Sequence, residues 1–182
     1  MMVLNVGGGS NRTLQEKYKG WEQHVLDIDP IVSPDICLDA KAMTSLPVES
    51  YDAVYCSHNL EHFYIHEVPK VLEGFLHVLK PNGFADIAVP SILNTLAHMN
   101  RFSLDLMDTY YRTGDGQPIS FHDVLYGCGS VMTNGNLFFA HKCGFTPRSL
   151  ADKMYEAGFK LVVIGEDGMN IFATGYKEKP CH

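Results

Sequence analysis

The chain has 182 residues, of which 46% are hydrophobic and 19% are charged, as expected of a protein with one buried core. Its formal net charge of −7 argues against a general nucleic-acid binder, because contacts with phosphates need a basic face. No apolar run approaches the roughly 18 residues of a membrane span, and from the first residues we expect no signal peptide. The five cysteines form no C-x-x-C pair, which favours reduced thiols over disulfides or a zinc ribbon. We therefore expect a single cytoplasmic domain over residues 1–182.

The first residues combine a short apolar run with three consecutive glycines. Residues 2–6 predict a buried strand, residues 7–9 a tight loop, and residues 12–19 a short helix. A strand, a glycine loop and a helix N-terminus let a nucleotide approach backbone N–H groups closely. The segment therefore indicates a nucleotide-binding loop.

Further apolar runs alternate with helical patterns or helix-length loops as far as residue 89. The apolar positions of residues 67–79 recur at helical spacing, and residues 80–83 (Lys-Pro-Asn-Gly) predict a turn after that helix. The expected strands are residues 22–30, 36–39, 51–57 and 84–89. Strands that alternate with helices in this way form βαβ units and a parallel sheet.

The second half of the chain carries weaker patterns. We expect a helix over residues 91–111, a loop over residues 113–119 and a mobile glycine-rich segment over residues 127–136. The inward positions expected for that helix are Leu93, Leu96, Leu104 and Met107. Because ligands bind at the carboxyl ends of the strands in such sheets, residues 91–145 are expected to form a variable substrate or lid region.

The end of the chain predicts one helix and one hairpin. Thr146 and Pro147 are typical of an N-cap and a first helical turn, and Gly158 is typical of the helix end. Residues 159–164 and 169–176 then predict an antiparallel pair of strands at the edge of the sheet.

The glycine loop departs from two phosphate-binding patterns. Gly7 and Gly9 fit the dinucleotide pattern G-x-G-x-x-G, but Arg12 stands at its last position, and no G-K-S or G-K-T follows for nucleoside triphosphates. Asp27 ends the second strand, where a carboxylate can accept both ribose hydroxyls. Asp39 ends the third strand and can accept the amino group of adenine. These residues favour an adenosine ligand with little anionic charge.

Together these motifs resemble the class I S-adenosylmethionine-dependent methyltransferases, and among them the compact bacterial type. The resemblance is carried by LNVGGGS at residues 4–10, VLDIDP at 25–30, DA at 39–40, LP at 46–47, YDAVYCSHNLEHF at 51–63 and VLEGFLHVLKPNG at 71–83. CGFT at 143–146 and EAGF at 156–159 extend it more loosely.

The resemblance implies a Rossmann-like, doubly wound α/β fold, whose seven-stranded sheet is mostly parallel with an antiparallel last strand. It implies S-adenosylmethionine as the cofactor. We expect a small-molecule or glycan-type acceptor, methylated at oxygen, because no basic patch indicates a nucleic acid and no hydrophobic helix indicates a lipid. The resemblance also implies a cofactor site made of Asn5, Gly7, Gly8, Gly9, Asp27, Ile28, Asp39, Ala40, Ser57 and His58.

Asn5 is a departure from the family, which commonly carries an acid at this position of the first motif. The departure leaves a second hypothesis open, a non-catalytic S-adenosylmethionine-binding regulatory domain. A nucleotide-linked oxidoreductase of the same sheet class is a further alternative, and the missing third glycine counts against it.

Methyl transfer needs a general base only where the acceptor arrives protonated, and histidine suits that role near neutral pH. His58, just past the fourth strand, is the first candidate, and His141 is the second. His58 also opens the pattern H-x-x-E-H with Glu61 and His62, an inverted zinc-protease signature. We expect no metal ion here, because that signature belongs within a helix and no third ligand is evident in the sequence.

Overall fold

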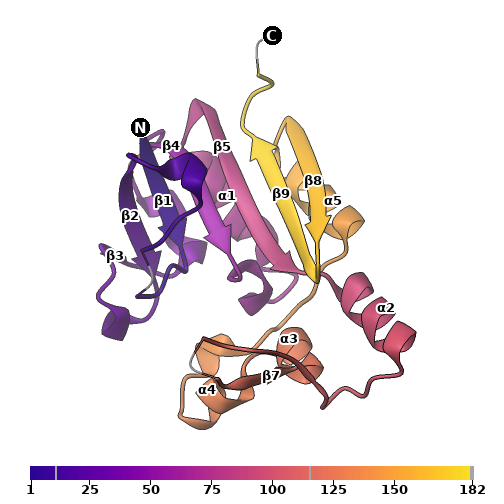
Figure 1. Cartoon of the computed structure of the whole chain (residues 1–182). Coiled ribbons are helices and arrows are strands. Elements are labelled where there is room, and N and C mark those ends of the chain that lie inside the picture. The colour runs from indigo at the N-terminus through magenta and orange to yellow at the C-terminus, as the bar shows by residue number, and fades with distance from the viewer. Residues whose placement is uncertain (11, 115, 181–182) are drawn as a thin grey trace.

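Seven strands form one sheet in the computed structural model, which describes residues 1–10, 12–114 and 116–180. Their order is β3-β2-β1-β4-β5-β9-β8 (Figure 1). Strands β1 to β5 pair in parallel, and β9 runs antiparallel to both of its neighbours. The bounds are β1 Met2–Val6, β2 Glu22–Asp27, β3 Ile36–Cys37, β4 Tyr51–Ser57, β5 Leu79–Pro90, β8 Leu161–Asp167 and β9 Asn170–Tyr176. The expected α/β sheet, with its antiparallel last strand, is confirmed.

One face of the sheet carries the larger core. The 3₁₀ helix η3 (Ala40–Ser45) and the helices α1 (Val68–Val78) and α5 (Pro147–Ala157) supply that core, and Figure 1 shows α1 and α5 behind the strands. Leu72 and Phe75 of α1 and Leu150 of α5 are fully buried. As predicted, Thr146 caps α5, and Gly158 ends it in the left-handed conformation.

The opposite face is covered by a short segment after β1. Only the 3₁₀ helix η1 (Glu16–Tyr18) forms there, so the helix expected over residues 12–19 is wrong. Tyr18 alone is buried in this segment, so there is no apolar stripe that would hold a longer helix against the sheet. The Tyr18 hydroxyl donates to the buried carboxylate of Asp86, which also accepts from Thr174 and pairs with Lys17.

The turn expected at residues 80–83 lies inside β5 as an irregularity. Tyr51 of β4 pairs with Leu79, and the regular register resumes only at Ala53 and Phe84. The four residues Lys-Pro-Asn-Gly therefore bulge out of the ladder, as their turn-forming composition favours.

Residues 91–145 differ most from the expectation. Helix α2 (Ile92–Phe102) ends at Ser103, whose φ of 52° is left-handed, so the helix stops well before residue 111. Leu93 and Leu96 are exposed rather than inward, because α2 is buried only at Thr95. Met107, beyond the end of α2, is also exposed, and Leu104 is partly buried. The remaining elements are β6 Thr109–Arg112, β7 Pro118–Ser120, α3 Phe121–Tyr126, α4 Gly129–Thr133 and η5 Leu137–Phe139.

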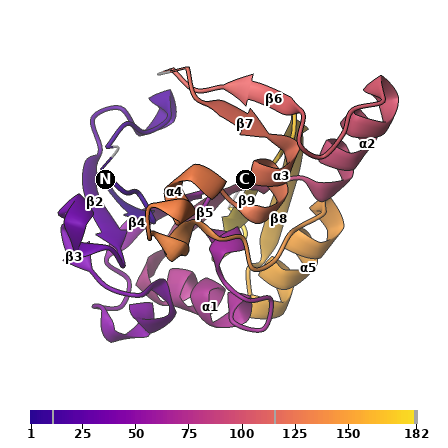
Figure 2. The same ribbon diagram turned by 90° about the horizontal axis from the view of Figure 1, so that it is seen from below.

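The loop expected at residues 113–119 is confirmed for its described residues up to Gln117, which connect β6 to β7, whereas Pro118 and Ile119 belong to β7. The glycine-rich segment expected at residues 127–136 contains α4. In Figure 1, α3, α4 and β7 lie beneath the ends to which β1 and β4 point, and Figure 2 shows the same elements in front of the sheet. Residues 103–145 thus form a cap over the carboxyl edge of the parallel strands. No helix among the described residues is long and apolar enough to cross a membrane.

A matched pair of leucine substitutions tests this assignment of faces. Leu72→Ala on α1 should lower the free energy of unfolding by about 2–5 kcal/mol, since the side chain is fully buried. Leu93→Ala on α2 removes a 55% exposed side chain, and should change the same free energy by less than about 0.5 kcal/mol. Urea denaturation followed by circular dichroism measures both. Equal losses would show that α2 packs differently.

Two strand cysteines provide a second test. Cys56 of β4 is fully buried, and burial raises the pKa of its thiol far above the ordinary value, whereas Cys37 of β3 is exposed. Because the thiolate is the reactive form, iodoacetamide should alkylate Cys37 in the native protein and leave Cys56 unmodified until the protein is denatured. Peptide mass spectrometry reads out both sites, and native alkylation at Cys56 would contradict the burial.

Candidate active site

A cavity opens where the strand order reverses between β1 and β4, at the carboxyl edge of the sheet. We call it the glycine-loop cavity. Such reversals are where open parallel sheets bind ligands. Of the residues predicted for the cofactor it contains Gly7, Asp27, Ile28, Asp39 and Ala40. Its other lining residues are Val6, Leu26, Leu38, Lys41, Asn59, His62, Phe63, Phe138 and Lys142.

Two of the three glycines in the loop, Gly7 and Gly8, have no room for a side chain. A Cβ on Gly7 would lie 2.1 Å from Nδ2 of Asn59, and a Cβ on Gly8 would lie 2.5 Å from Nδ2 of Asn5. Gly7 and Gly9 also have left-handed φ values of 69° and 57°. Asn5 is buried beneath the loop and supports Gly8 without lining the cavity. The bare backbone of this loop is therefore a requirement of packing as well as of conformation.

Two carboxylates at strand ends border the glycine-loop cavity. Asp27 accepts hydrogen bonds from Gly9 N at 2.9 Å and Asp29 N at 3.0 Å, so it fastens the glycine loop to the end of β2. Asp39 accepts from Lys41 N at 2.9 Å and so caps η3. A carboxylate offers about four acceptor positions, so both groups retain capacity for a ligand.

Asn59, Phe63 and Phe138 are lining residues that the sequence analysis did not single out. Asn59 Oδ1 is buried and has no hydrogen-bond partner in the described part of the chain. An orphaned buried acceptor is costly, and a ligand donor would satisfy it. The two phenylalanines and Leu38 give the cavity an apolar wall. An apolar wall with carboxylate and amide acceptors suits an adenosine with a polar tail, so the residues fit the expected cofactor.

A second cavity, of about 520 Å³, adjoins the first, because His62 lines both. We call it the histidine cavity. It lies between the ends of β5 and β9 and the cap of residues 103–145. Its lining residues are His58, His62, Pro90, Tyr110, Tyr111, Ile119, Asp123, Val124, Cys128, Phe139, His141, Met169 and Asn170. Ser57, which was predicted to lie at the methyl-donor end, lines neither of the two cavities.

Both candidate catalytic histidines line the histidine cavity and approach Glu61. His58 Nδ1 lies 3.4 Å from Glu61 Oε1, and interaction with this carboxylate raises the pKa of His58. His141 Nε2 lies 4.0 Å from the same oxygen, and burial lowers the pKa of His141 against the opposing effect of Glu61. The histidine cavity therefore contains two imidazoles in different electrostatic states.

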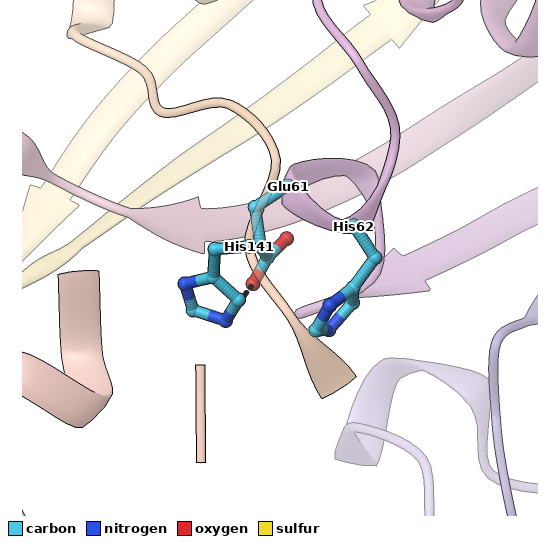
Figure 3. A group of neighbouring side chains, drawn as sticks. All are labelled: Glu61, His62 and His141. Atoms are coloured by element: carbon cyan, nitrogen blue, oxygen red, sulfur yellow. Dashed lines mark ion pairs between the residues drawn. The ribbon is translucent and has the colours of Figure 1, made fainter. Parts of the chain in front are cut away.

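Glu61 and His62 also gather with His141, and one ligand atom from each lies within 4.8 Å of the others (Figure 3). Glu61 and His62 come from η4 (Leu60–His62), the turn after β4, whereas His141 comes from the cap. The sequence showed no third partner for the H-x-x-E-H pattern, because nothing local in the chain links residue 141 to residue 61. The fold supplies that partner.

Comparison with known proteins identifies a family model and a shared fold. Residues 4–87 match the model of the methyltransferase domain. A search of curated proteins found no match. A "SAM dependent methyltransferase" structure from Archaeoglobus fulgidus superposes with a TM-score of 0.62 at 16% identity, over 97% of this chain and 86% of the other.

Two further solved structures superpose over 97% of this chain. A possible histamine N-methyltransferase from Thermotoga maritima gives a TM-score of 0.61 at 13% identity, over 82% of its own length. The 1,6-didemethyltoxoflavin-N1-methyltransferase of Burkholderia thailandensis, solved with its substrate and S-adenosylhomocysteine, gives 0.56 at 15% identity, over 70% of its length. These likenesses show a common fold, and the family model matches residues 4–87, which carry the glycine loop. The matched model and the shared fold support the class I S-adenosylmethionine-dependent methyltransferase superfamily.

Proposed function

We propose that this methyltransferase modifies a small-molecule or glycan-type acceptor at an oxygen atom, and that the acceptor binds in the histidine cavity. The observation that carries the proposal is the adjacency of the two cavities through His62. Transfer requires the donor and the acceptor to meet in line, and two adjoining cavities give each a place. In this proposal the acceptor region is residues 91–145.

The cofactor would lie in the glycine-loop cavity. Asp27 and Ile28 would hold the ribose, and Asp39 with Ala40 would meet the adenine. The loop of Gly7, Gly8 and Gly9, supported by Asn5, would let the methionine end approach the backbone, with Asn59 accepting from its amino group. His58, which follows β4 and lines the histidine cavity, would lie toward the sulfonium.

S-adenosylmethionine supplies a methyl group already activated on a sulfonium, so the protein mainly positions the acceptor and excludes water. With the cofactor and acceptor bound, the protein would align the acceptor oxygen with the methyl group, and an imidazole of this chain would take the acceptor proton. His58 is the first candidate for that base, because it lies on the cavity rim with its side chain half exposed. His141 is the second and lies deeper, against Glu61 and His62.

The dimensions and composition of the histidine cavity favour a small acceptor. About 520 Å³ lined by Tyr110, Tyr111 and Phe139 accommodates a molecule of metabolite size. The Burkholderia structure named above holds bound 1,6-didemethyltoxoflavin, a small molecule, which supports this class of acceptor. The net charge of −7 disfavours nucleic acid. The free thiols of the described residues suit a cytoplasmic enzyme.

Ligand-induced stabilisation tests the cofactor site. S-adenosylmethionine and S-adenosylhomocysteine should each raise the melting temperature, because a ligand of the native state stabilises it. Asp27→Ala should weaken binding roughly tenfold to a hundredfold, as expected for lost hydrogen bonds to a charged group. Asp29→Ala is the matched control: this partly buried carboxylate lies two residues away, outside the cavity. Differential scanning fluorimetry reads out all three proteins, and no shift with the wild type would contradict the proposal.

Transfer of labelled methyl groups tests the acceptor site. The protein and methyl-labelled S-adenosylmethionine, incubated with a low-molecular-weight metabolite extract, should yield a labelled small product. Val124→Trp should fill the histidine cavity and abolish the product while the cofactor-induced melting shift remains. Val163→Trp, at an exposed position of β8, should leave product formation intact. If Val124→Trp formed as much product as the wild type, the acceptor would not bind in the histidine cavity. If the wild type bound the cofactor but formed no product, a regulatory domain would be favoured.

A further inference from the structure

Glu61 presents a buried carboxylate without a hydrogen-bond donor. Its side chain is 1% exposed, and neither oxygen has a hydrogen-bond partner in the described part of the chain. No lysine or arginine of the described residues forms an ion pair with it; Lys142, close in sequence to His141, instead lies over the ring of Tyr64. A buried charge without a hydrogen-bond donor lowers the stability of the folded protein unless a cation compensates it.

The groups nearest to this carboxylate are imidazoles. His58 Nδ1 and His141 Nε2 lie 3.4 Å and 4.0 Å from Oε1, and the rings of His62 and His141 have centroids 4.9 Å apart. Figure 3 shows the side chains of Glu61, His62 and His141 converging from two segments of the chain. One carboxylate and two imidazoles thus face a common point beside the histidine cavity.

Backbone groups contact the two converging imidazoles and so orient them. His62 Nδ1 lies 3.1 Å from the carbonyl oxygen of Ala140, so that Nδ1 donates and leaves Nε2 as an acceptor. Interaction with the backbone of Leu125 favours the protonated form of His141, although burial lowers its pKa. Histidines that ligate metals characteristically donate their other ring nitrogen to a carbonyl or carboxylate in this way.

The two segments are also fastened to each other. The backbone carbonyl of Glu61 accepts from Lys142 N at 2.8 Å and Cys143 N at 3.2 Å, and His141 N donates to the carbonyl of Tyr126 at 3.1 Å. Residue 141 is therefore held beside residues 61 and 62 by the main chain, so the convergence does not depend on side-chain rotamers alone.

We propose that Glu61, His62 and His141 bind one divalent first-row transition metal ion, of which Zn²⁺ is the best match. Two imidazoles and one carboxylate with an open fourth position form a recognised catalytic zinc set. Magnesium and calcium prefer all-oxygen sites. Tetrahedral ligation needs donor atoms about 3.3 Å apart, so the side chains must close from the spacing of up to 4.8 Å. The Glu61 carboxylate can move because no hydrogen bond holds it.

The open position would face the acceptor, a consequence that rests on the proposed function. A bound metal lowers the pKa of an oxygen ligand and polarises it, so an acceptor hydroxyl would be activated at the ion. His141 would then be a ligand rather than the base, and His58 would be left to take the proton. The proposal replaces our expectation from the sequence that the H-x-x-E-H segment binds no metal.

Cobalt binding tests the site without any acceptor. After treatment with a chelator and its removal, the full chain is titrated with Co²⁺, and the visible d–d absorption and the metal content are measured. The wild type should bind one Co²⁺ per chain with the intense bands of low-symmetry coordination, and Zn²⁺ should displace it. Glu61→Gln and His141→Ala should each weaken binding at least tenfold. His66→Ala, which removes an exposed histidine four residues after His62, should bind as the wild type does.

The Glu61→Gln variant separates metal binding from folding. The metal-free variant should melt no lower than the metal-free wild type, because a neutral amide of the same shape replaces an uncompensated buried charge. Zn²⁺ should raise the melting temperature of the wild type alone. Wild-type binding that is no stronger than that of His141→Ala, or Co²⁺ spectra unchanged in Glu61→Gln, would overturn the proposal.

The melting shift with S-adenosylhomocysteine, measured in the same samples, distinguishes the two proposals. Glu61→Gln should retain this shift. A wild type that binds cobalt but shows no cofactor shift would contradict the proposed function and leave the metal site standing.

Discussion

The structure depends on a glycine loop in which Gly7 and Gly8 pack so closely against two asparagines that no Cβ fits at either position. Asn5 lies beneath Gly8, Asn59 lies beside Gly7, and Asp27 fastens Gly9 from the neighbouring strand. These contacts hold three separate segments, the ends of β1, β2 and β4, at one place on the edge of the sheet. The glycine-loop cavity exists because this junction is filled by backbone and amide groups rather than by larger side chains.

The turn after β4 connects this junction to the rest of the site. Asn59 faces the glycine loop, His62 lines both cavities, and Glu61 points to the imidazoles of the histidine cavity. Backbone hydrogen bonds from Lys142 and Cys143 to Glu61 then draw the cap onto the same turn. One short segment, residues 58–62, thus links the proposed cofactor site, the proposed acceptor site and the proposed metal ligands.

Much of the fold could be predicted because its signals are local. Apolar runs ending in acids marked β2 and β3, and the Thr146 cap and Gly158 marked both ends of α5. At α2 the spacing of apolar residues gave a wrong prediction, because Leu93 and Leu96 face solvent. A periodic pattern indicates an apolar helix face but not whether another element packs against that face. Residues 12–19 likewise had helical length without an apolar stripe to bury.

The residues of the site likewise include some that the sequence could predict and others that it could not. Gly7, Asp27 and Asp39 follow strands and were predictable, since parallel strands end at a common edge. The neighbours of Glu61 were not predictable from the sequence. His141 is brought to Glu61 by backbone contacts of the cap, and the cap has no clear sequence pattern. The orphaned oxygen of Asn59 was equally hidden, since hydrogen-bond satisfaction depends on tertiary contacts.

A crystal structure with S-adenosylhomocysteine tests the account most directly. The account predicts the ligand in the glycine-loop cavity, with the ribose hydroxyls on Asp27, the adenine beside Asp39 and the sulfur directed toward the histidine cavity. Density for the ligand at another surface, or a ribose that makes no contact with Asp27, would contradict it.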